Sequence, residues 1–474
     1  MEINLDTLTL SDATEAIRAR RLTSTKLTEA FLERIERYNP FYNCYITVSS
    51  NEALAQAHAA DALLAEGTWL GPLHGIPISV KDTIATKDIR TTIGSPAYKD
   101  WIPDVSAPVV EHLLNAGAVI LGKNTTHEFS AGQANPLFGE PQNPWLPGRS
   151  CLMSSHGSAA AVACGLALAS VGTDTGGSVR LPSAAVGVSG FKPSLAIVSR
   201  MGCYPRSDTL DMVGFMTHTV RELAWMTSVA SRDDGIDLQM RGVRPQDFTA
   251  QFGLKLQGIR IGHRAFDDET SPLETEVREH YREALEELAR AGAELVEVRT
   301  PDDAEVRTAC LAITLGEWAE AHRDLLQNRL AELSPAVQRL MLMGAAMPAA
   351  EYVHAQRVRQ SYVARYEEIF RKIDVMAVTT LAMVPYDQGA QQITVDGITE
   401  SPLFMALRHT VPQNMTGQPS VSVPMRFSKE GLPTALMLTG RRYEDAFVLA
   451  VADAYQQITD WHTKRPVLRT PTAF

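Results

Sequence analysis

The sequence lacks the patterns that mark metal centres, disulfide frameworks and membrane spans. Its twelve histidines include no HxxxH or HExxH pair, which argues against a zinc hydrolase. Its five cysteines are odd in number and form no CxxC pair, as is typical of a reduced compartment. The longest apolar-rich run, 159–171, is too short and too interrupted by glycine to cross a bilayer. We therefore predict no metal and no cofactor.

The chain also lacks a cluster of basic residues and a recognisable leader. The formal net charge is -11 at pH 7, and no Lys/Arg cluster runs against it, which argues against a nucleic-acid-binding surface. The first 21 residues contain no basic region followed by an apolar one, so no signal peptide is expected. These absences predict a cytoplasmic protein, with no nucleic acid and no membrane as partners.

What the chain does contain is an alternation of helical and strand-like segments. Residues 107–115 have a helical pattern, Gly117 ends it, and 118–121 reads as a short buried strand. The same order recurs over 275–298. Strands that alternate with helices predict an α/β protein with a largely covered sheet.

Three helices are expected near the N-terminus, over 11–21, 24–39 and 51–66. In the second of them, Ser24 is placed to cap the free amides and Pro40 to end the helix.

In the second half of the chain, 375–381, 420–424 and 434–438 are strand candidates. The polar, turn-rich stretch 233–251 predicts a surface connection. Helical character over 304–372 predicts a cap on the sheet, where the shape of a substrate would be read.

The chemistry begins with a glycine-flanked serine. Residues 172–182 read GTDTGGSVRLP, and the two glycines before Ser178 let the backbone approach closely and direct successive amides at one point. Such a nest suits a tetrahedral oxyanion, with Ser178 as the attacking group, although a plain glycine turn has the same pattern. The DTG that begins at Asp174 has no second DTG or DSG, so an aspartic protease is excluded.

A serine cluster and a lysine complete the constellation. Residues 154–165 read SSHGSAAAVACG at a helix start, where the serines serve either as caps or as catalytic groups. Ser154 precedes Ser178 by 24 positions, which leaves room for a helix and a strand to return the chain. Lys81 ends the apolar strand 76–80; it either extends to solvent or, if buried, loses its charge and acts as a base.

Together, GIPISVKD (75–82), SSHGSAAAVACG and GTDTGGSVRLP resemble the motifs of the amidase signature family. Supporting matches are GKNTTHEF (122–129) and NMTGQPSVSVP (414–424). The resemblance runs from about residue 5 to residue 466 and is weakest over 232–400.

This resemblance implies a single α/β/α domain over 1–474, with a central mixed sheet covered by helices. Within it, the expected segments are N-terminal helices (1–66), the signature core (67–231), a variable substrate-shaping region (232–400) and a C-terminal return to the sheet (401–474). Family members are often dimers, so the resemblance also points to a homodimer.

The resemblance further implies a mechanism. Ser178 would be the nucleophile, and Ser154, held on a cis peptide, would pass its proton to neutral Lys81. Water would then clear the acyl-enzyme. Glu128 and Arg180 are expected to form a structural charged pair or network beneath the site. The oxyanion hole would consist of the backbone amides of Thr175, Gly176, Gly177 and Ser178.

The serine-rich motif departs from the family pattern. It reads LMSSHGS where the family usually has GGSSGGS, so Met153 and His156 stand at glycine positions. Either the pocket accommodates Met153, or the local geometry differs and Ser155 takes part. Both substitutions lie where substrate could touch them, which favours an unusual specificity, and His156 is a rival general base.

The sequence thus predicts a carboxamide hydrolase that works through a Ser178 acyl-enzyme, on a small aryl or alkyl amide, an anilide or a substituted urea. The first alternative is a glutaminase subunit of an amidotransferase, which supplies ammonia for tRNA-dependent amidation; the C-terminal TDWHTKRP (459–466) fits both. The second alternative is a non-catalytic binding protein with the same fold.

Overall fold

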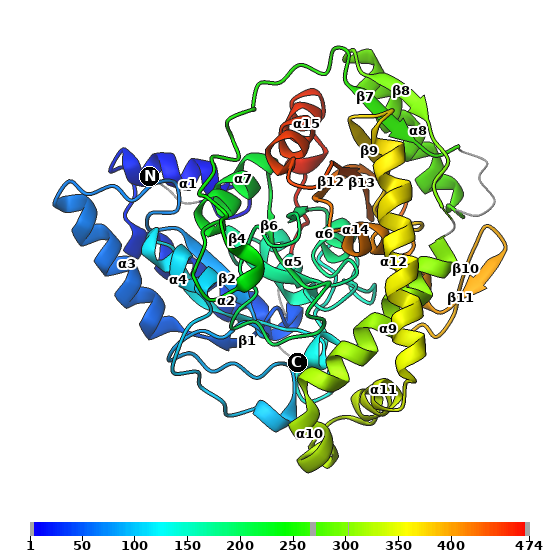
Figure 1. Ribbon diagram of the computed structural model, residues 1–474. Helices are drawn as coiled ribbons and strands as arrows, with labels where there is room; N and C mark the ends of the chain where they lie inside the picture. Colours follow the sequence, from blue (N-terminus) through cyan, green and yellow to red (C-terminus); the bar gives the residue numbers. More distant parts are fainter. Residues whose placement is uncertain (1–3, 266–271, 302, 470–474) are drawn as a thin grey trace.

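The computed structural model describes residues 4–265, 272–301 and 303–469. Their main feature is an eleven-stranded sheet with the order β1-β3-β2-β4-β6-β5-β12-β13-β9-β7-β8 (Figure 1). Its strands are β1 (Tyr45–Val48), β2 (Pro77–Lys81), β3 (Val119–Asn124), β4 (Ala169–Asp174), β5 (Ser189–Lys192), β6 (Met212–Thr217), β7 (Arg260–His263), β8 (Glu294–Glu297), β9 (Val375–Thr379), β12 (Ser420–Phe427) and β13 (Pro433–Thr439). A small hairpin of β10 (Ile393–Val395) and β11 (Ile398–Glu400) stands apart from it.

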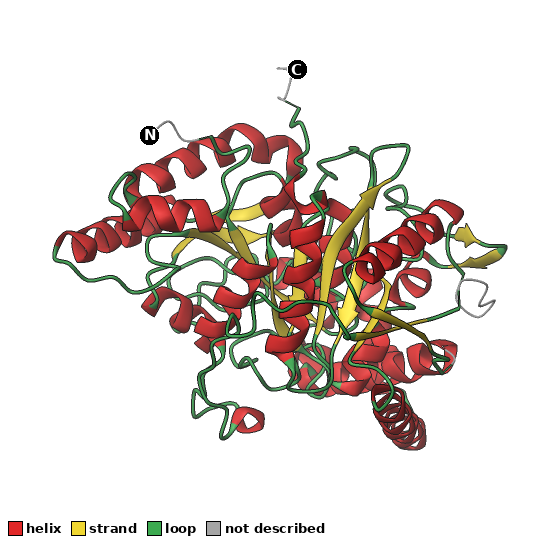
Figure 2. Cartoon of the chain, turned by 90° about the horizontal axis from the view of Figure 1, so that it is seen from above, coloured by secondary structure: helices red, strands yellow, loops and turns green. Residues whose placement is uncertain are grey.

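Helices lie on both sides of this sheet (Figure 2). They are α1 (Leu10–Arg18), α2 (Ser24–Tyr42), α3 (Ser50–Ala65), α4 (Pro108–Asn115), α5 (His156–Ala163), α6 (Arg180–Val186), α7 (Val220–Ala230), α8 (Thr275–Arg290), α9 (Asp303–Ala321), α10 (Arg323–Asn328), α11 (Pro335–Ala345), α12 (Ala349–Phe370), α13 (Pro402–Leu407), α14 (Val411–Thr416) and α15 (Asp445–Ile458). The predicted fold class, a mixed sheet covered by helices, is confirmed.

The pairing of three strands explains where the site forms. Strand β2 runs parallel to both β3 and β4, while β4 runs antiparallel to β6. All residues of β2, β3 and β4 are buried, as expected for parallel strands covered on both faces. Lys81 is the last residue of β2 and Asp174 the last of β4, so the segments after both strands emerge at the same edge of the sheet.

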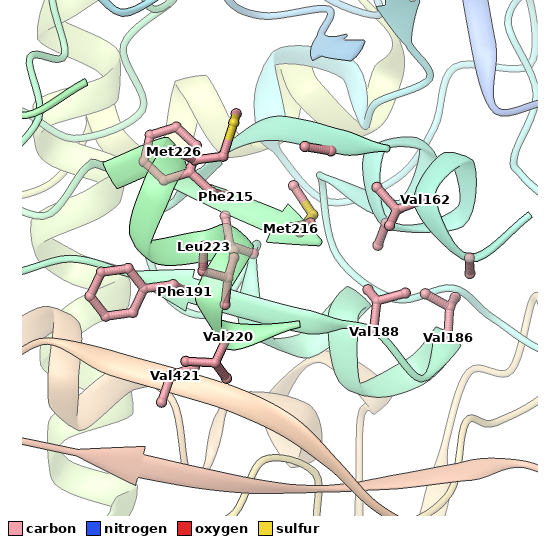
Figure 3. Packing of buried hydrophobic residues seen from close by; sticks show 14 of the residues in the cluster. Val162, Val186, Val188, Phe191, Phe215, Met216, Val220, Leu223, Met226 and Val421 are labelled. Atoms are coloured by element: carbon pink, nitrogen blue, oxygen red, sulfur yellow. The ribbon is translucent and has the colours of Figure 1, made fainter. Parts of the chain in front are cut away.

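An apolar core lies behind this edge and supports it (Figure 3). Phe191 of β5 and Phe215 of β6 are opposite each other in the ladder and fully buried. Val162 of α5, Leu223 of α7 and Val421 of β12 belong to the same cluster. Interiors of this kind are close-packed, so the helices that carry the serine motifs rest on a rigid support.

Helix α2 differs from the prediction at both ends. Pro40 does not stop it: the helix continues for two more residues because Pro40 lies in its last turn, and it ends at the left-handed Asn43 (φ 50°). The N-cap is Thr23 and not Ser24. Ser24 is buried, and its hydroxyl donates instead to the carbonyl of Gly75, 2.9 Å away.

The other predicted elements occur close to their expected places. The helical stretch predicted over 304–372 forms α9 to α12, which gather on one side of the molecule in Figure 1. The predicted connection over 233–251 consists of turns, bends and irregular backbone apart from the short 3₁₀ helix Leu238–Met240. The four-segment division of a single domain stays a prediction.

Candidate active site

Lys81, Ser154 and Thr173 meet at the edge of the sheet. The Nζ atom of Lys81 lies 2.7 Å from Ser154 Oγ and 2.7 Å from Thr173 Oγ1. The lysine side chain is completely buried, and no ion pair among the described residues includes it. Two neutral hydroxyls therefore hold an amine that has no carboxylate in contact with it.

This environment changes the acidity of the lysine. Burial lowers the pKa of Lys81 to about 7, and the charges of Asp211 and Asp174 oppose that shift only in part. A substantial fraction of the amine is consequently neutral near pH 7. A neutral amine in contact with a serine hydroxyl can act as a general base, as expected for a buried Lys81.

Ser178 lies in the loop after β4 and lines a pocket together with Met153, Thr175 and Gly176. It is 6% exposed, so its hydroxyl is reachable from the pocket without being open to bulk water. Within the described part of the chain, no hydrogen bond links Ser178 to Ser154. Catalytic hydrogen bonds are often long in unliganded enzymes and tighten when substrate binds.

A buried carboxylate shapes the loop that carries Ser178. Asp174 accepts hydrogen bonds from the amide of Gly177 (2.8 Å) and the amide of Val179 (3.1 Å), and it pairs with Arg180 (2.9 Å). Although burial alone would raise the pKa of Asp174, the charge and hydrogen bonds of Arg180 lower it to about 2. Asp174 is therefore an ionised structural anchor of this loop.

The anchoring changes the expected oxyanion hole. The Gly177 amide is already bonded to Asp174, so it is not free to bind an oxyanion. Among the described residues, the backbone amides of Thr175, Gly176 and Ser178 donate no hydrogen bond. Gly177 has a structural role instead. Its φ of +135° favours glycine, and an added Cβ would lie 2.4 Å from Thr410 Oγ1.

The serine-rich motif adopts a different backbone from the one that the resemblance implies. The peptide before Ser154 is trans, because the described residues contain no cis bond. Leu152 (φ 61°) and Met153 (φ 54°) take left-handed conformations instead. Met153 still reaches the pocket wall. The Ser155 hydroxyl donates to the carbonyl of Thr173 at 3.2 Å, and no described hydrogen bond joins it to Lys81.

His156 begins α5 and is buried against a second histidine. Its ring meets that of His127 edge to face, with 4.6 Å between centroids, and its Nε2 has no partner among the described atoms. Burial lowers the pKa of His156 well below its ordinary value and that of His127 to about 3. His127, not His156, lines the pocket. A ring that resists protonation this strongly is a poor general base at neutral pH.

The pocket has a volume of about 730 Å³, including space open to solvent. Helices α9 and α13 supply part of the pocket wall, so the first helix of the predicted cap lies at the site. The lining residues are His127, Ser130, Ala131, Gly132, Met153, Thr175, Gly176, Ser178, Arg206, Arg307, Cys310, Leu311, Thr314, Leu403, Phe404 and Leu407.

Sequence reasoning missed several of these groups. Thr173 stands in the GTDTGGS motif itself, and its position next to the strand end was the available signal. His127 lies within GKNTTHEF, but nothing local showed that it faces the pocket. Glu128 and Arg180 belong to separate networks: Glu128 accepts from Ser95 Oγ (2.8 Å), whereas Arg180 pairs with Asp174.

Comparison with known proteins identifies what this chain is similar to. The family model described as Amidase matches residues 26–449. A glutamyl-tRNA(Gln) amidotransferase subunit of Roseiflexus sp. (strain RS-1) is 36% identical and covers 98% of this chain and 99% of its own length. The corresponding subunit of Chloroflexus aurantiacus (strain ATCC 29366 / DSM 635 / J-10-fl) is 37% identical over 97% of this chain and 98% of its own length. The solved peptide amidase from Stenotrophomonas maltophilia is 28% identical, covers 98% of this chain and 99% of its own, and has a TM-score of 0.84.

These relatives correct one prediction. A small-molecule substrate without a nucleic-acid partner was expected, but the relatives are subunits of an enzyme named for a tRNA. The net charge of a chain bears on its own surface and not on that of a partner protein, so it could not exclude such a partner. For the membrane, no helix among the described residues is both long and apolar enough to span one.

The family match covers most of the chain, and the relatives above 30% identity cover nearly all of it. Lys81, Ser154 and Ser178 all lie within the matched residues 26–449. The chain belongs to the amidase signature family, whose enzymes act on carbon–nitrogen bonds.

Proposed function

We propose that this chain cleaves a terminal carboxamide through an acyl-enzyme on Ser178. The contact that carries the proposal is the 2.7 Å approach of Lys81 Nζ to Ser154 Oγ, inside a buried site next to the pocket. A serine hydroxyl is a weak nucleophile until a neighbouring base takes its proton, and a lysine with a pKa near 7 is matched to that task.

In the proposed reaction, Ser178 Oγ attacks the carbonyl carbon while its proton passes to Ser154 and the proton of Ser154 passes to Lys81. The amides of Thr175, Gly176 and Ser178 stabilise the tetrahedral oxyanion. The C–N bond then breaks as Ser154 returns a proton to the leaving nitrogen, which departs as ammonia from a primary amide. Water attacks the remaining ester by the same route and regenerates the serine.

We further propose that the chain is the ammonia-releasing component of an amidotransferase, with glutamine as the amide and tRNA-borne acyl groups as the acceptors in the cytoplasm. Full-length identity of 36–37% to glutamyl-tRNA(Gln) amidotransferase subunits supports this assignment over a stand-alone enzyme. Ammonia would then pass to a partner protein that binds the tRNA.

A second candidate is hydrolysis of an aryl or alkyl amide, an anilide or a substituted urea. The apolar part of the pocket wall favours it, because Leu311, Leu403, Phe404 and Leu407 line the cavity with Met153. Wide apolar walls with few polar groups are typical of sites for apolar ligands.

The test compares the chain alone with the chain co-expressed with the partner subunits of its own organism. Glutamine, acetanilide and a diarylurea are assayed in parallel, and Ser178→Ala and Ser155→Ala serve as the matched serine variants. The amidotransferase assignment predicts glutamine turnover that rises in the complex and disappears in Ser178→Ala but not in Ser155→Ala. Turnover of the aromatic amides by the isolated chain, without glutamine turnover in either form, would replace it with the second candidate.

A further inference from the structure

One cation in the pocket has no described carboxylate in direct contact with its guanidinium, although the charge of Asp211 acts on it. Arg206 lines the cavity with Ser178, yet it is only 9% exposed. No carboxylate of the described residues lies within 4.0 Å of its guanidinium, and its Nη1 is buried without a hydrogen-bond partner. Burial lowers the pKa of Arg206 to about 10, which still leaves it charged at neutral pH. A buried and unpaired charge is costly and in native proteins marks a site that a ligand completes.

Arg206 is also held in place before any ligand arrives. Its guanidinium lies over the ring of Trp318, 4.2 Å from the centroid, and Trp318 is fully buried. The amides of Arg206 and Ser207 donate to Asp211 at 2.7 and 2.9 Å. His322 Nε2 lies 2.8 Å from the carbonyl oxygen of Pro205, just before the arginine. Because these contacts already fix the loop, binding of a ligand would cost little further conformational entropy.

The other arginine in the pocket is not available in the same way. Arg307 Nη1 donates to Glu400 at 3.1 Å and to the carbonyl oxygen of Phe404 at 2.7 Å. Among the described residues that line the pocket, two are arginines and none is acidic. The side chains that face a substrate are therefore positively charged, and Arg206 is the arginine whose guanidinium has no described carboxylate in contact with it.

We propose that Arg206 binds a carboxylate on the substrate, so that the pocket selects amides that carry a carboxylate over amides that carry none. The guanidinium offers a planar fork of donors that matches a carboxylate, and Trp318 covers one of its faces. Apolar residues such as Leu311 and Leu407 would contact the carbon chain between carboxylate and amide. This inference deepens the proposed amide hydrolysis and rests on it.

Calorimetric titration of the full chain carrying Ser178→Ala measures binding without turnover. The probes are 4-carbamoylbutanoate, pentanamide and 5-aminopentanamide, which share a carbamoyl chain and carry a negative, zero and positive charge. We expect 4-carbamoylbutanoate to bind about 30-fold or more tightly than pentanamide, and 5-aminopentanamide to bind most weakly. Adding Arg206→Gln should bring the three within about threefold, and Arg206→Lys should retain part of the preference.

Arg329→Gln is the matched control, because Arg329 also lies over an aromatic ring, Tyr98 at 5.2 Å, but outside the pocket. It should leave all three affinities unchanged. Equal binding of the three probes, failure of a folded Ser178→Ala chain to bind 4-carbamoylbutanoate, or a preference that survives Arg206→Gln would overturn the inference. Labelling of Ser178 by phenylmethanesulfonyl fluoride is measured separately: labelling without charge preference rejects only the role of Arg206, and charge preference without labelling rejects only the serine chemistry.

Discussion

At the scale of the residue, burial alone does not distinguish the proposed base. Lys81, Lys123 and Lys192 are all fully buried, and burial lowers the pKa of each, to about 7, 8 and 7. Lys123 Nζ donates to the carbonyl of Ile84 and to the hydroxyls of Thr86 (2.9 Å) and Thr91 (3.1 Å). Lys192 Nζ donates to the carbonyl of Gln418 at 2.5 Å. Neither threonine lines the pocket, whereas Ser154 follows Met153, which does. What sets Lys81 apart is its contact with a hydroxyl next to the pocket.

The lowered pKa of Lys81 predicts a pH dependence for the reactivity of Ser178. Below about pH 7 the amine is protonated and cannot accept a proton; above it the amine is neutral. The rate of Ser178 labelling by phenylmethanesulfonyl fluoride should therefore rise through about pH 7 and reach a plateau. Measurement from pH 5 to 10 checks this, and a flat profile would exclude the lysine as the base.

Thr173→Val gives a sharper form of the same experiment. Thr173 Oγ1 accepts a hydrogen bond from Lys81 Nζ, which favours the charged amine. Its removal should move the midpoint of the profile to lower pH and reduce the plateau rate, because the amine is also less well oriented. A midpoint that stays in place would mean that the profile reports another group.

The same lysine should reduce the stability of the fold. Its pKa falls from 10.5 in the unfolded chain to about 7, so the unfolded state binds the proton more strongly and the stability of the native protein rises between pH 7 and 10.5. At pH 7 the penalty is on the order of 4 kcal/mol. Lys81→Met removes it but leaves two hydroxyls short of a partner, at about 1–3 kcal/mol each.

We therefore expect Lys81→Met to be inactive, to lie within about 2 kcal/mol of the wild type in stability at pH 7, and to fall progressively below the wild type toward pH 10. Urea unfolding at pH 7, 8.5 and 10 measures the difference in the free energy of unfolding. A loss of stability that does not depend on pH would show that Lys81 contributes mainly through packing.

At the scale of the element, the predictable parts of the site are those built within one short segment. Ser178 and its neighbouring amides lie in a single loop, and Ser154 lies in the turn just before α5, so local patterns singled them out as candidates. Arg206 and His127 were not found, because each reaches the pocket through the packing of segments far apart in the sequence. For the same reason the strand alternation predicted a covered sheet but not its order, in which β12 and β13 lie between β5 and β9.

Helix α9 supplies part of the pocket wall, so its packing should influence substrate binding. Helix α11 packs closely against α9 at Gly344, where an added Cβ would lie 2.1 Å from the carbonyl oxygen of Leu315. Gly344→Ala should displace α9, destabilise the protein by about 1–3 kcal/mol and raise KM more than it lowers kcat. Urea unfolding and steady-state kinetics on the best substrate measure both effects.

Gly316→Ala on α9 itself is the matched control. Its Cβ would approach Tyr352 only to 3.4 Å, an ordinary contact, and alanine favours the helix by up to about 1 kcal/mol. It should leave KM unchanged and the stability equal or higher. Similar kinetic effects of the two variants would mean that the exact position of α9 does not control the pocket.

At the scale of the whole molecule, the sheet joins segments from the entire chain. Strand β1 lies at one edge, β7 and β8 from the variable region lie at the other, and the C-terminal strands β12 and β13 connect the two halves. Without the C-terminal pair, β5 and β9 would each have an unpaired edge, and an exposed strand edge invites aggregation.

This threading predicts a single cooperative unfolding transition, despite the length of the chain. The six tryptophans are spread from Trp69 to Trp461 and report on both halves of the sheet. Urea curves from tryptophan fluorescence and from far-ultraviolet circular dichroism should coincide, and a chain truncated after residue 400 should fail to fold because both halves lose their central neighbours.

By contrast, a protease cut within the turn-rich stretch 233–251 crosses no strand of the sheet, so the nicked fragments should stay associated and keep the same transition. Two separated transitions would show instead that the chain folds as more than one unit. A soluble folded chain of residues 1–400 would show that the C-terminal strands are not needed to hold the two halves of the sheet.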